Sequence, residues 1–382
     1  MDQIGITHQT IFADLLQKCL DAAFDEEFPE NGSFTHQTHN GKNYWYYLGY
    51  AGSSGGQTKA RKYTKYVGPA DDPEITKRVE AFKHSKSSYK ERRSLVASLR
   101  QVGIPNPPAL VGDVVEALWK AGIFRLRGVL IGTLAYQTYA GLLGVKLPSA
   151  PIMTGDVDFA QFHAVSMLLE DTMPPMLETL KAVDETFRER PHQADSRATT
   201  AFVNAKDFTV EFLTPNRGSD DNTGHPAKMP ALGGAWAEPL RYLDFLIRNP
   251  VRSLLLHKGG IAVTVPAPER FAVHKLMVAD LRLKDPNGLT KARKDALQAG
   301  SLFEALVLNS MGSDLGLAWM EAWDRGPNWR AHLSAGLKRV TSAQKDFLRR
   351  SVVEACKEEN KSPGDYGFAE EPEEEKTHAA TL

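Results

Sequence analysis

Two short stretches decide the fold class of this chain: GVLIGTLAY at residues 128–136 and TGDVDF at residues 154–159. The first predicts a buried strand that leads through a Gly-Thr pair into an apolar helix, because branched apolar residues are followed by a turn residue and then by helix formers. The second predicts a strand on which Asp156 and Asp158 share one face, since residues two apart in a strand point the same way. A strand, a turn, a helix and an acidic strand in succession are typical of an α/β fold.

The same alternation of strands and helices extends over residues 106–266, the predicted central domain. Apolar periodicity predicts helices at residues 114–121, 133–143 and 161–184 (the last as one or two segments), and strands at residues 124–131, 152–159, 201–203, 208–213 and 261–265. We therefore expect a mixed sheet with flanking helices, an α/β or α+β arrangement.

Regions with other patterns flank this domain. Residues 1–105 end at a proline-rich run and predict a helix at 8–24, a hairpin of aromatic strands at 44–48 and 62–67, and a charged helix at 74–101. Residues 267–362 predict a helical domain with helices at 269–284, 288–309, 313–324 and 341–358. Residues 363–382 are acidic and have no apolar face, which predicts a disordered tail.

The overall composition argues against several classes of protein. The chain has 382 residues, more than one hydrophobic core usually holds, and its formal net charge of −1 provides no global attraction to nucleic acid or membranes. The two cysteines, Cys19 and Cys356, are far apart in sequence, which argues against a disulfide framework or a structural zinc site. We find no signal peptide and no run of roughly 18 apolar residues, so we expect a cytoplasmic protein without a membrane span.

Three acids and a glycine turn carry the predicted chemistry. Asp156 and Asp158 repel each other unless a cation neutralises them, and Glu211 lies within another apolar strand. If the two strands are neighbours, the three carboxylates meet, and such hard oxygen ligands are those that Mg²⁺ prefers. Gly132 and Thr133 open a helix, where backbone N–H groups and a hydroxyl can bind phosphate. The sequence thus predicts a triphosphate site beside a metal site.

This constellation resembles the nucleotidyltransferase superfamily that includes DNA polymerase β. Its members have an apolar strand, a Gly-Ser or Gly-Gly pair that opens a helix, two alternating aspartates on the next strand, and one further acid on a later strand. The similarity covers roughly residues 124–215 and extends more loosely to about residue 300. The segments at residues 265–276 and 291–295, and the hairpin with Trp45 and residues 66–68, resemble a bacterial branch of that superfamily.

Two features depart from the family pattern. Thr133 stands where Ser or Gly is usual, although it keeps a hydroxyl group. The spacing of 23 positions between Thr133 and Asp156 is longer than in minimal members, which implies an inserted loop at residues 142–153.

The resemblance implies an enzyme that moves a nucleoside monophosphate from an NTP, ATP among them, to a hydroxyl acceptor and releases pyrophosphate. Asp156 and Asp158 would bind two magnesium ions, with Mn²⁺ as an alternative, and Glu211 would complete the site. The acceptor stays open between an RNA end, a protein and a small molecule. Some relatives modify tRNA as toxins, so a toxin role is open by analogy.

Basic residues supply further candidate nucleotide ligands: Lys275, Lys291, Lys294 and Arg217. For each lysine alone, a solvated helix face is the simpler interpretation, and a solvent-exposed turn is an equal alternative for Arg217. His274, next to Lys275, is expected to be structural and hydrogen-bonded to backbone.

The acids have simpler interpretations as well. Asp156 and Asp158 can lie at a solvated strand end, and Glu211 can pair with Arg197 or Lys206. A catalytically inactive nucleotide- or nucleic-acid-binding protein with the same fold is therefore the alternative function. Three retained acids argue against it, since buried unpaired carboxylates are unfavourable without a metal.

A basic run in the N-terminal region is a candidate contact for nucleic acid. Between Lys59 and Arg100 there are 12 Lys or Arg and 5 Asp or Glu, a local net charge of +7 (12 − 5). Basic and tyrosine residues can bind phosphates and stack on bases. A solvated charged helix is the simpler interpretation, and we favour it.

Overall fold

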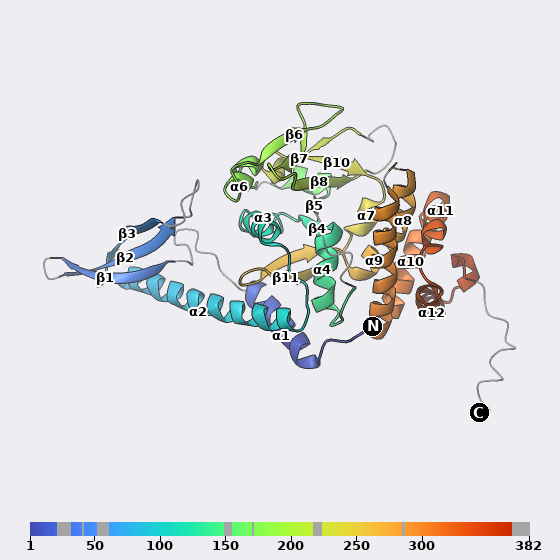
Figure 1. Ribbon diagram of the computed structural model, residues 1–382, viewed down its shortest axis with the longest axis horizontal. Coiled ribbons are helices and arrows are strands. Elements are labelled where there is room, and N and C mark those ends of the chain that lie inside the picture. Colours follow the sequence, from blue (N-terminus) through green and yellow to red (C-terminus); the bar gives the residue numbers. More distant parts are fainter. Residues whose placement is uncertain are drawn as a thin grey trace.

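The computed structural model describes residues 1–20, 32–39, 42–51, 61–148, 155–169, 172–216, 224–284, 286 and 288–368. It has a central mixed sheet with flanking helices, a group of C-terminal helices against one side of it, and an N-terminal arm that projects from the other side (Figure 1). The mixed α/β fold class predicted from the sequence is confirmed. No helix in the described part of the chain combines the length and the apolar character that a membrane span requires.

The N-terminal arm consists of a small sheet and a long helix. Its elements are β1 (Ser33–His39), β2 (Lys42–Ala51), β3 (Arg61–Pro69) and α2 (Pro73–Gln101), and α1 (Ile6–Leu20), which precedes them in the chain, packs on α4 and β12. The three strands form an antiparallel sheet in the order β1-β2-β3 at the outer end of α2 (Figure 1). The predicted hairpin corresponds to β2 and β3. Strand β1 was not predicted, because its sequence, SFTHQTH, is polar. Trp45 and Tyr47 are buried against this sheet, which explains its aromatic composition.

The central sheet has the order β4-β5-β8-β10-β9, and β7 also pairs with β8 and with β6. Its strands are β4 (Val129–Ile131), β5 (Asp156–Ala160), β6 (Arg188–Pro191), β7 (Thr199–Val203), β8 (Thr209–Pro215), β9 (Ala227–Lys228) and β10 (Trp236–Leu240). Strand β5 runs antiparallel to β4 and parallel to β8, so the sheet is mixed. Phe159 and Phe212 stack on neighbouring strands with ring centroids 6.0 Å apart, within the main hydrophobic core.

Short helices and a hairpin surround this sheet. They are α3 (Ala109–Lys120), α4 (Gly132–Leu142), α5 (His163–Leu168), α6 (Met176–Lys181), α7 (Leu243–Leu246), and the antiparallel pair β11 (Val251–Leu255) and β12 (Ile261–Val265). Strand β4 is shorter than the predicted strand at residues 124–131, because a turn precedes it and Arg127 has a left-handed φ of 67°. Residues 149–153 of the predicted insert lie outside the described residues.

The C-terminal region is helical, as the sequence predicts. Its helices are α8 (Pro268–Leu281), α9 (Gly288–Leu308), α10 (Gly312–Asp324), α11 (Pro327–Leu337) and α12 (Ser342–Glu358). A capping box of Thr341 and Gln344 starts α12, and α11 was not predicted. One continuous hydrophobic cluster runs from Val111 to Phe368, so apolar packing crosses the predicted domain boundary after residue 266.

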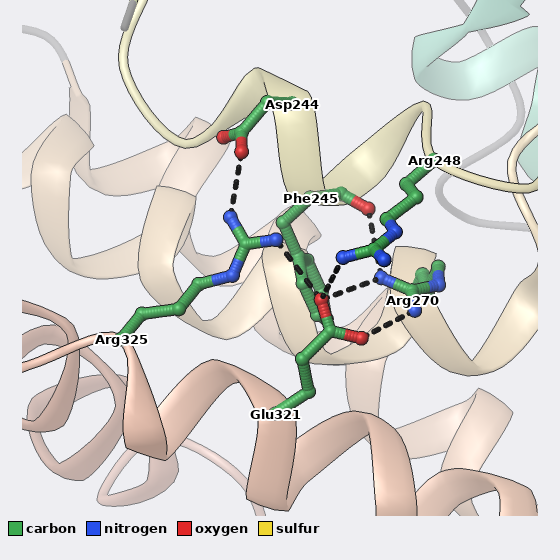
Figure 2. A network of polar contacts seen from close by, with 6 residues as sticks. All are labelled: Asp244, Phe245, Arg248, Arg270, Glu321 and Arg325. Atoms are coloured by element: carbon green, nitrogen blue, oxygen red, sulfur yellow. Dashed lines mark hydrogen bonds and ion pairs between the residues drawn. The ribbon is translucent and has the colours of Figure 1, made fainter. Parts of the chain in front are cut away.

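A network of charged residues fixes α8 and α10 against α7 (Figure 2). Glu321 on α10 accepts hydrogen bonds from Arg270 on α8 and from Arg325, and Arg325 also donates to Asp244 on α7 at 2.7 Å. The Arg270 guanidinium lies 4.8 Å from the ring centroid of Phe245, so the network also packs on an aromatic face. This anchoring holds α8 in place beside the sheet.

The end of the chain differs in part from the predicted disordered tail. Residues 363–368 include a short 3₁₀ helix, η4 (Pro363–Tyr366), and they pack on α10. The Trp319 indole donates to the Tyr366 carbonyl at 3.0 Å, and Phe368 is buried beside Trp319. Two aromatic residues therefore anchor this segment despite its acidic surroundings. Residues 369–382 lie outside the described residues.

Candidate active site

The two aspartates lie at the beginning of β5 and face the same way. Asp156 is exposed and Asp158 is half-buried, while Val157 and Phe159 between and after them are buried in the core. This alternation is the period of a strand with one apolar face. The predicted common face of the aspartate pair is therefore present.

Glu211 lies directly beside Asp158 in the sheet. Strands β5 and β8 are parallel, and Asp158 and Glu211 are register partners. Neighbouring strands are about 4.8 Å apart, so the two residues stand next to each other. The sequence left open whether the two acidic strands are neighbours, and the structure shows that they are.

The Glu211 side chain has a partner that sequence reasoning missed. Arg190 Nη2 donates to Glu211 Oε1 at 2.6 Å, whereas Arg197, one of the predicted partners, pairs with Asp195. The register explains the contact, because Arg190 is opposite Ala201, and Ala201 is opposite Glu211. Arg190 and Glu211 are 21 positions apart in the chain, so their contact can be recognised only once the pairing of β6 with β7 is known.

The surroundings of Asp158 disfavour its ionised form. Burial, together with the negative charges of Asp156 and Glu211, raises the pKa of Asp158 to about 7, although the positive charges of Lys275 and Arg282 act to lower it. A carboxyl group with this pKa is a functional-site candidate, since burial and like charges have been brought together around it. A cation beside it would remove the unfavourable repulsion.

Gly132 forms the turn from β4 into α4, directly against Asp158. Its φ of +68° lies in the left-handed region, which favours glycine. A Cβ atom at this position would lie 2.6 Å from Asp158 Oδ2. Glycine is therefore required both by the backbone conformation and by the close carboxylate. The turn brings the start of α4, with Thr133, to the aspartates.

A cavity of about 230 Å³ joins these parts. The residues that line it are Gly132, Thr133, Gly155, Asp156, Asp158, Lys275, Arg282, Lys291, Lys294 and Asp295. The sheet thus supplies acids, α4 supplies a helix start, and α8 and α9 supply cations to one hollow. We refer to it below as the catalytic cavity, after the role that we propose for it.

An ion-pair network organises the cations of the catalytic cavity. Buried Asp295 on α9 accepts from Lys275 Nζ and from Arg282 Nε, both at 2.6 Å. Burial acts to raise the pKa of Asp295, but the charges and hydrogen bonds of Lys275 and Arg282 outweigh it and lower that pKa. Burial and the charge of Lys275 lower the pKa of Lys294, although the nearby Asp156 opposes this shift.

The structure therefore brings most of the predicted site residues together. Gly132, Thr133, Asp156, Asp158 and three predicted lysines line the catalytic cavity. Glu211 is beside Asp158 in the sheet but does not line the cavity, and Arg217 lies outside the described residues. Arg282 and Asp295 were not predicted as site residues; a helical spacing of seven from Lys275 to Arg282 is the signal that was available for the arginine.

Comparison with known families adds an independent observation. A family model described as nucleotidyltransferase matches residues 109–324, more than half of the chain. The chain belongs to this nucleotidyltransferase family. The match begins at the first residue of α3 and ends at the last residue of α10, so it includes the sheet, α4 and the helices that carry the site cations. No curated protein and no solved structure gives a significant match to the chain.

Nucleotidyltransferases typically use divalent metal ions, and the donor set at β5 and β8 fits one. Asp156 and Glu211 lie near Asp158 and their negative charges act to raise its pKa, and oxygen ligands of this kind suit Mg²⁺ or Mn²⁺. A different cluster of the described residues, however, has ligand atoms that all lie within 4.8 Å of one another, as a metal site requires. It consists of Asp113, Glu116 and His257. Glu211 is held by Arg190, which is consistent with this result.

The Asp113 cluster of the nucleotidyltransferase already contains its own cation. Lys258 Nζ lies 2.7 Å from Asp113 Oδ1 and 2.6 Å from Glu116 Oε2. His257 Nε2 is 2.9 Å from Asp113 Oδ1. The lysine neutralises both carboxylates and joins the β11–β12 turn to α3, so the ion pairs account for this cluster without a metal.

We expect Asp295→Asn to destabilise this nucleotidyltransferase by about 3 kcal/mol, because two cations in a buried network would lose their shared partner. Urea denaturation followed by circular dichroism measures the change in the free energy of unfolding. The matched control is Asp346→Asn, which removes exposed ion pairs to Arg349 and Arg350 and should change stability by less than about 1 kcal/mol. Equal, small effects of both changes would contradict the assigned role of Asp295.

Proposed function

We propose that the chain transfers a nucleoside monophosphate from an NTP to a hydroxyl group of an acceptor and releases pyrophosphate, in an Mg²⁺-dependent reaction. The single observation that carries this proposal is the register pairing of Asp158 with Glu211, next to the glycine turn that opens α4. Acids from two strands, a helix start and a group of cations then surround one small cavity. Phosphoryl transfer needs such positioning and charge neutralisation above all.

In this proposal Asp156, Asp158 and Glu211 hold the divalent ions, which supply neutralisation of phosphate charge and a lowered pKa of the acceptor hydroxyl when bound. The start of α4, with Gly132 and Thr133, binds phosphate oxygens through backbone N–H groups and a hydroxyl. Glu211 must turn from Arg190 toward the aspartates to take part, and Arg190 then faces the phosphates or the acceptor.

The cations of α8 and α9 bind the remaining phosphate charge. Lys275, Lys291 and Lys294 line the cavity, and Asp295 orients the first of them. The acceptor oxygen attacks the α-phosphorus in line, and the bond from this phosphorus to the pyrophosphate oxygen breaks. The acceptor proton passes to Glu211 or to water.

Transfer of label from α-³²P-labelled NTPs tests the proposal. The wild-type chain should label a molecule in a cell extract when Mg²⁺ is present, and Asp156→Ala and Asp158→Ala should not. The non-catalytic alternative has an observation in its favour, since Arg190 neutralises Glu211 in this structure. Tight NTP binding without label transfer or pyrophosphate release in the same extract would support that alternative and contradict the enzyme.

The stability of the metal-free protein should depend on pH through Asp158. Its pKa is raised from 3.8 to about 7 in the folded chain, so between these values the folded state binds more protons than the unfolded state. The contribution of Asp158 to stability therefore falls as pH rises from about 4 to about 7, and its full penalty is present above pH 7. We expect Mg²⁺ to raise Tm more at pH 8 than at pH 5, in melting curves monitored by intrinsic fluorescence.

The variant Asp158→Asn separates this effect from the other titrating groups. Without a charge at position 158, metal-free protein at pH 8 should have a higher Tm than the wild type, and Mg²⁺ should raise it less. A wild-type Tm that responds equally to Mg²⁺ at both pH values, or an unchanged response in the variant, would place metal binding elsewhere.

A further inference from the structure

A second cavity, of about 770 Å³, adjoins the catalytic cavity and shares Arg282 with it. The two hollows lie against neighbouring faces of α8: His274, Val278 and Leu281 line the larger one, and Lys275 lines the catalytic cavity. At about 230 Å³ the catalytic cavity is below the roughly 300–1,000 Å³ of small-molecule pockets, so it has room for phosphates and ions but not for a whole nucleotide. The larger cavity lies within that range.

The walls of the larger cavity combine apolar surface with positive charge. Leu243 and Tyr242, from the segment after β10, face the apolar residues of α8. Arg241, Arg282 and Lys284 also line it, and no acidic residue is present among the described residues that do so. An anion with a flat apolar part matches these walls, because arginines and lysines bind phosphate and an aromatic ring can stack on a base.

His274 is a nearly buried polar group in the wall of this cavity. It is 8% exposed, and within the ranges that the structure describes its imidazole makes no hydrogen bond or ion pair. The backbone hydrogen bond that the sequence led us to expect is thus not found there. Burial, with the charge of Lys275, lowers the pKa of His274 to about 3, so the ring is neutral and offers one donor and one acceptor. Because the ring lines the cavity, a ligand there can form a hydrogen bond with its donor or its acceptor nitrogen.

We propose that the larger cavity binds a nucleoside phosphate unit, with the base against the apolar wall and Tyr242, a base edge or ribose hydroxyl on His274, and phosphate on Arg241, Arg282 and Lys284. This inference rests on the proposed nucleotidyl transfer, because the shared Arg282 connects the unit to the catalytic cavity. The same chemistry has two sources: the nucleoside of the donor NTP, or the terminal nucleotide of an RNA acceptor.

A cavity-filling substitution on α11 tests the proposal with a matched control. Ala331 is exposed and lines the larger cavity, so Ala331→Trp should fill it without disturbing the core. Ala335, one turn later on the same helix, lines a different cavity, so Ala335→Trp is the control. The probes are inorganic tripolyphosphate, each common NTP and a short single-stranded RNA with a free 3′ hydroxyl, all with Mg²⁺, measured by calorimetry with the full chain.

The binding measurements distinguish the nucleoside of the donor NTP from the terminal nucleotide of an RNA acceptor. If the cavity holds the donor nucleoside, Ala331→Trp weakens NTP binding about tenfold or more and leaves tripolyphosphate binding unchanged. If it holds the RNA end, the same variant weakens RNA binding and leaves NTP binding unchanged. Equal affinities of the Ala331→Trp and Ala335→Trp proteins for NTPs and RNA, or no binding of either probe by the wild-type chain, would overturn the proposal.

His274 provides a second, independent readout. His274→Leu should weaken the same probe severalfold because the hydrogen bond is lost, and His274→Gln should restore part of the affinity. Equal affinities of the Leu and Gln variants would contradict the assigned contact. These binding results do not depend on turnover, so failure of the proposed transfer reaction appears separately, as absence of label transfer from a chain that still binds nucleotide.

Discussion

Asp158→Asn is expected to reduce label transfer by about a thousandfold or more, while the chain stays folded. The change keeps the shape of the side chain and removes the charge next to Glu211 and Asp156. Charge stabilisation by bound metal contributes several kcal/mol to a transition state, and each 1.4 kcal/mol corresponds to a tenfold change in rate. The measurement is the initial rate of transfer from an α-labelled NTP, with circular dichroism as the check on folding.

Asp207→Asn is the matched control for this substitution. Asp207 is exposed in the turn that leads into β8, and its left-handed φ of 58° is one that Asn tolerates. The control should transfer label at the wild-type rate. A folded Asp158→Asn protein with more than about a tenth of wild-type activity would exclude Asp158 as a ligand of the reacting groups.

Gly132→Ala is expected to lower the transfer rate about a hundredfold. The new Cβ would lie 2.6 Å from Asp158 Oδ2, so the carboxylate or the start of α4 must move. A displacement of about 1 Å between catalytic groups can reduce a rate about a hundredfold. The measurement is the kcat of transfer at saturating NTP, because the change affects the alignment of the phosphates with the acids.

Gly103→Ala separates this contact from backbone strain. Gly103 lies between α2 and α3 and also has a positive φ, +90°. Apart from its own chain neighbours, no heavy atom of the described residues lies within 4 Å of the place that a Cβ atom would take there. Both substitutions should lower Tm through the strained backbone, and Gly132→Ala alone should lower kcat. An equal loss of kcat in both variants would show that strain, and not the contact with Asp158, is responsible.

The sequence predicted the parts of the fold that depend on local pattern. The alternation of apolar and acidic residues at Asp156 to Phe159, and the glycine before an apolar helix, are local signals, and they identified β5 and α4. Strand β1 was not predicted because its sequence is polar and has no alternation of apolar residues. Helix α11 was not predicted because it begins at a Gly-Pro pair and has a mixed composition. Tertiary packing stabilises both.

The sequence by itself determined the acidic pair, the glycine turn and the cations that were candidates for phosphate binding, since each depends on residue type and short spacing. Tertiary structure decided which strands are neighbours, and so it placed Glu211 beside Asp158, paired it with Arg190, and brought Asp295 to Lys275 and Arg282. It also decided that His274 lines a second cavity. The physical reason is that strand order and helix packing arise from burial of apolar faces over the whole chain, which no local spacing encodes.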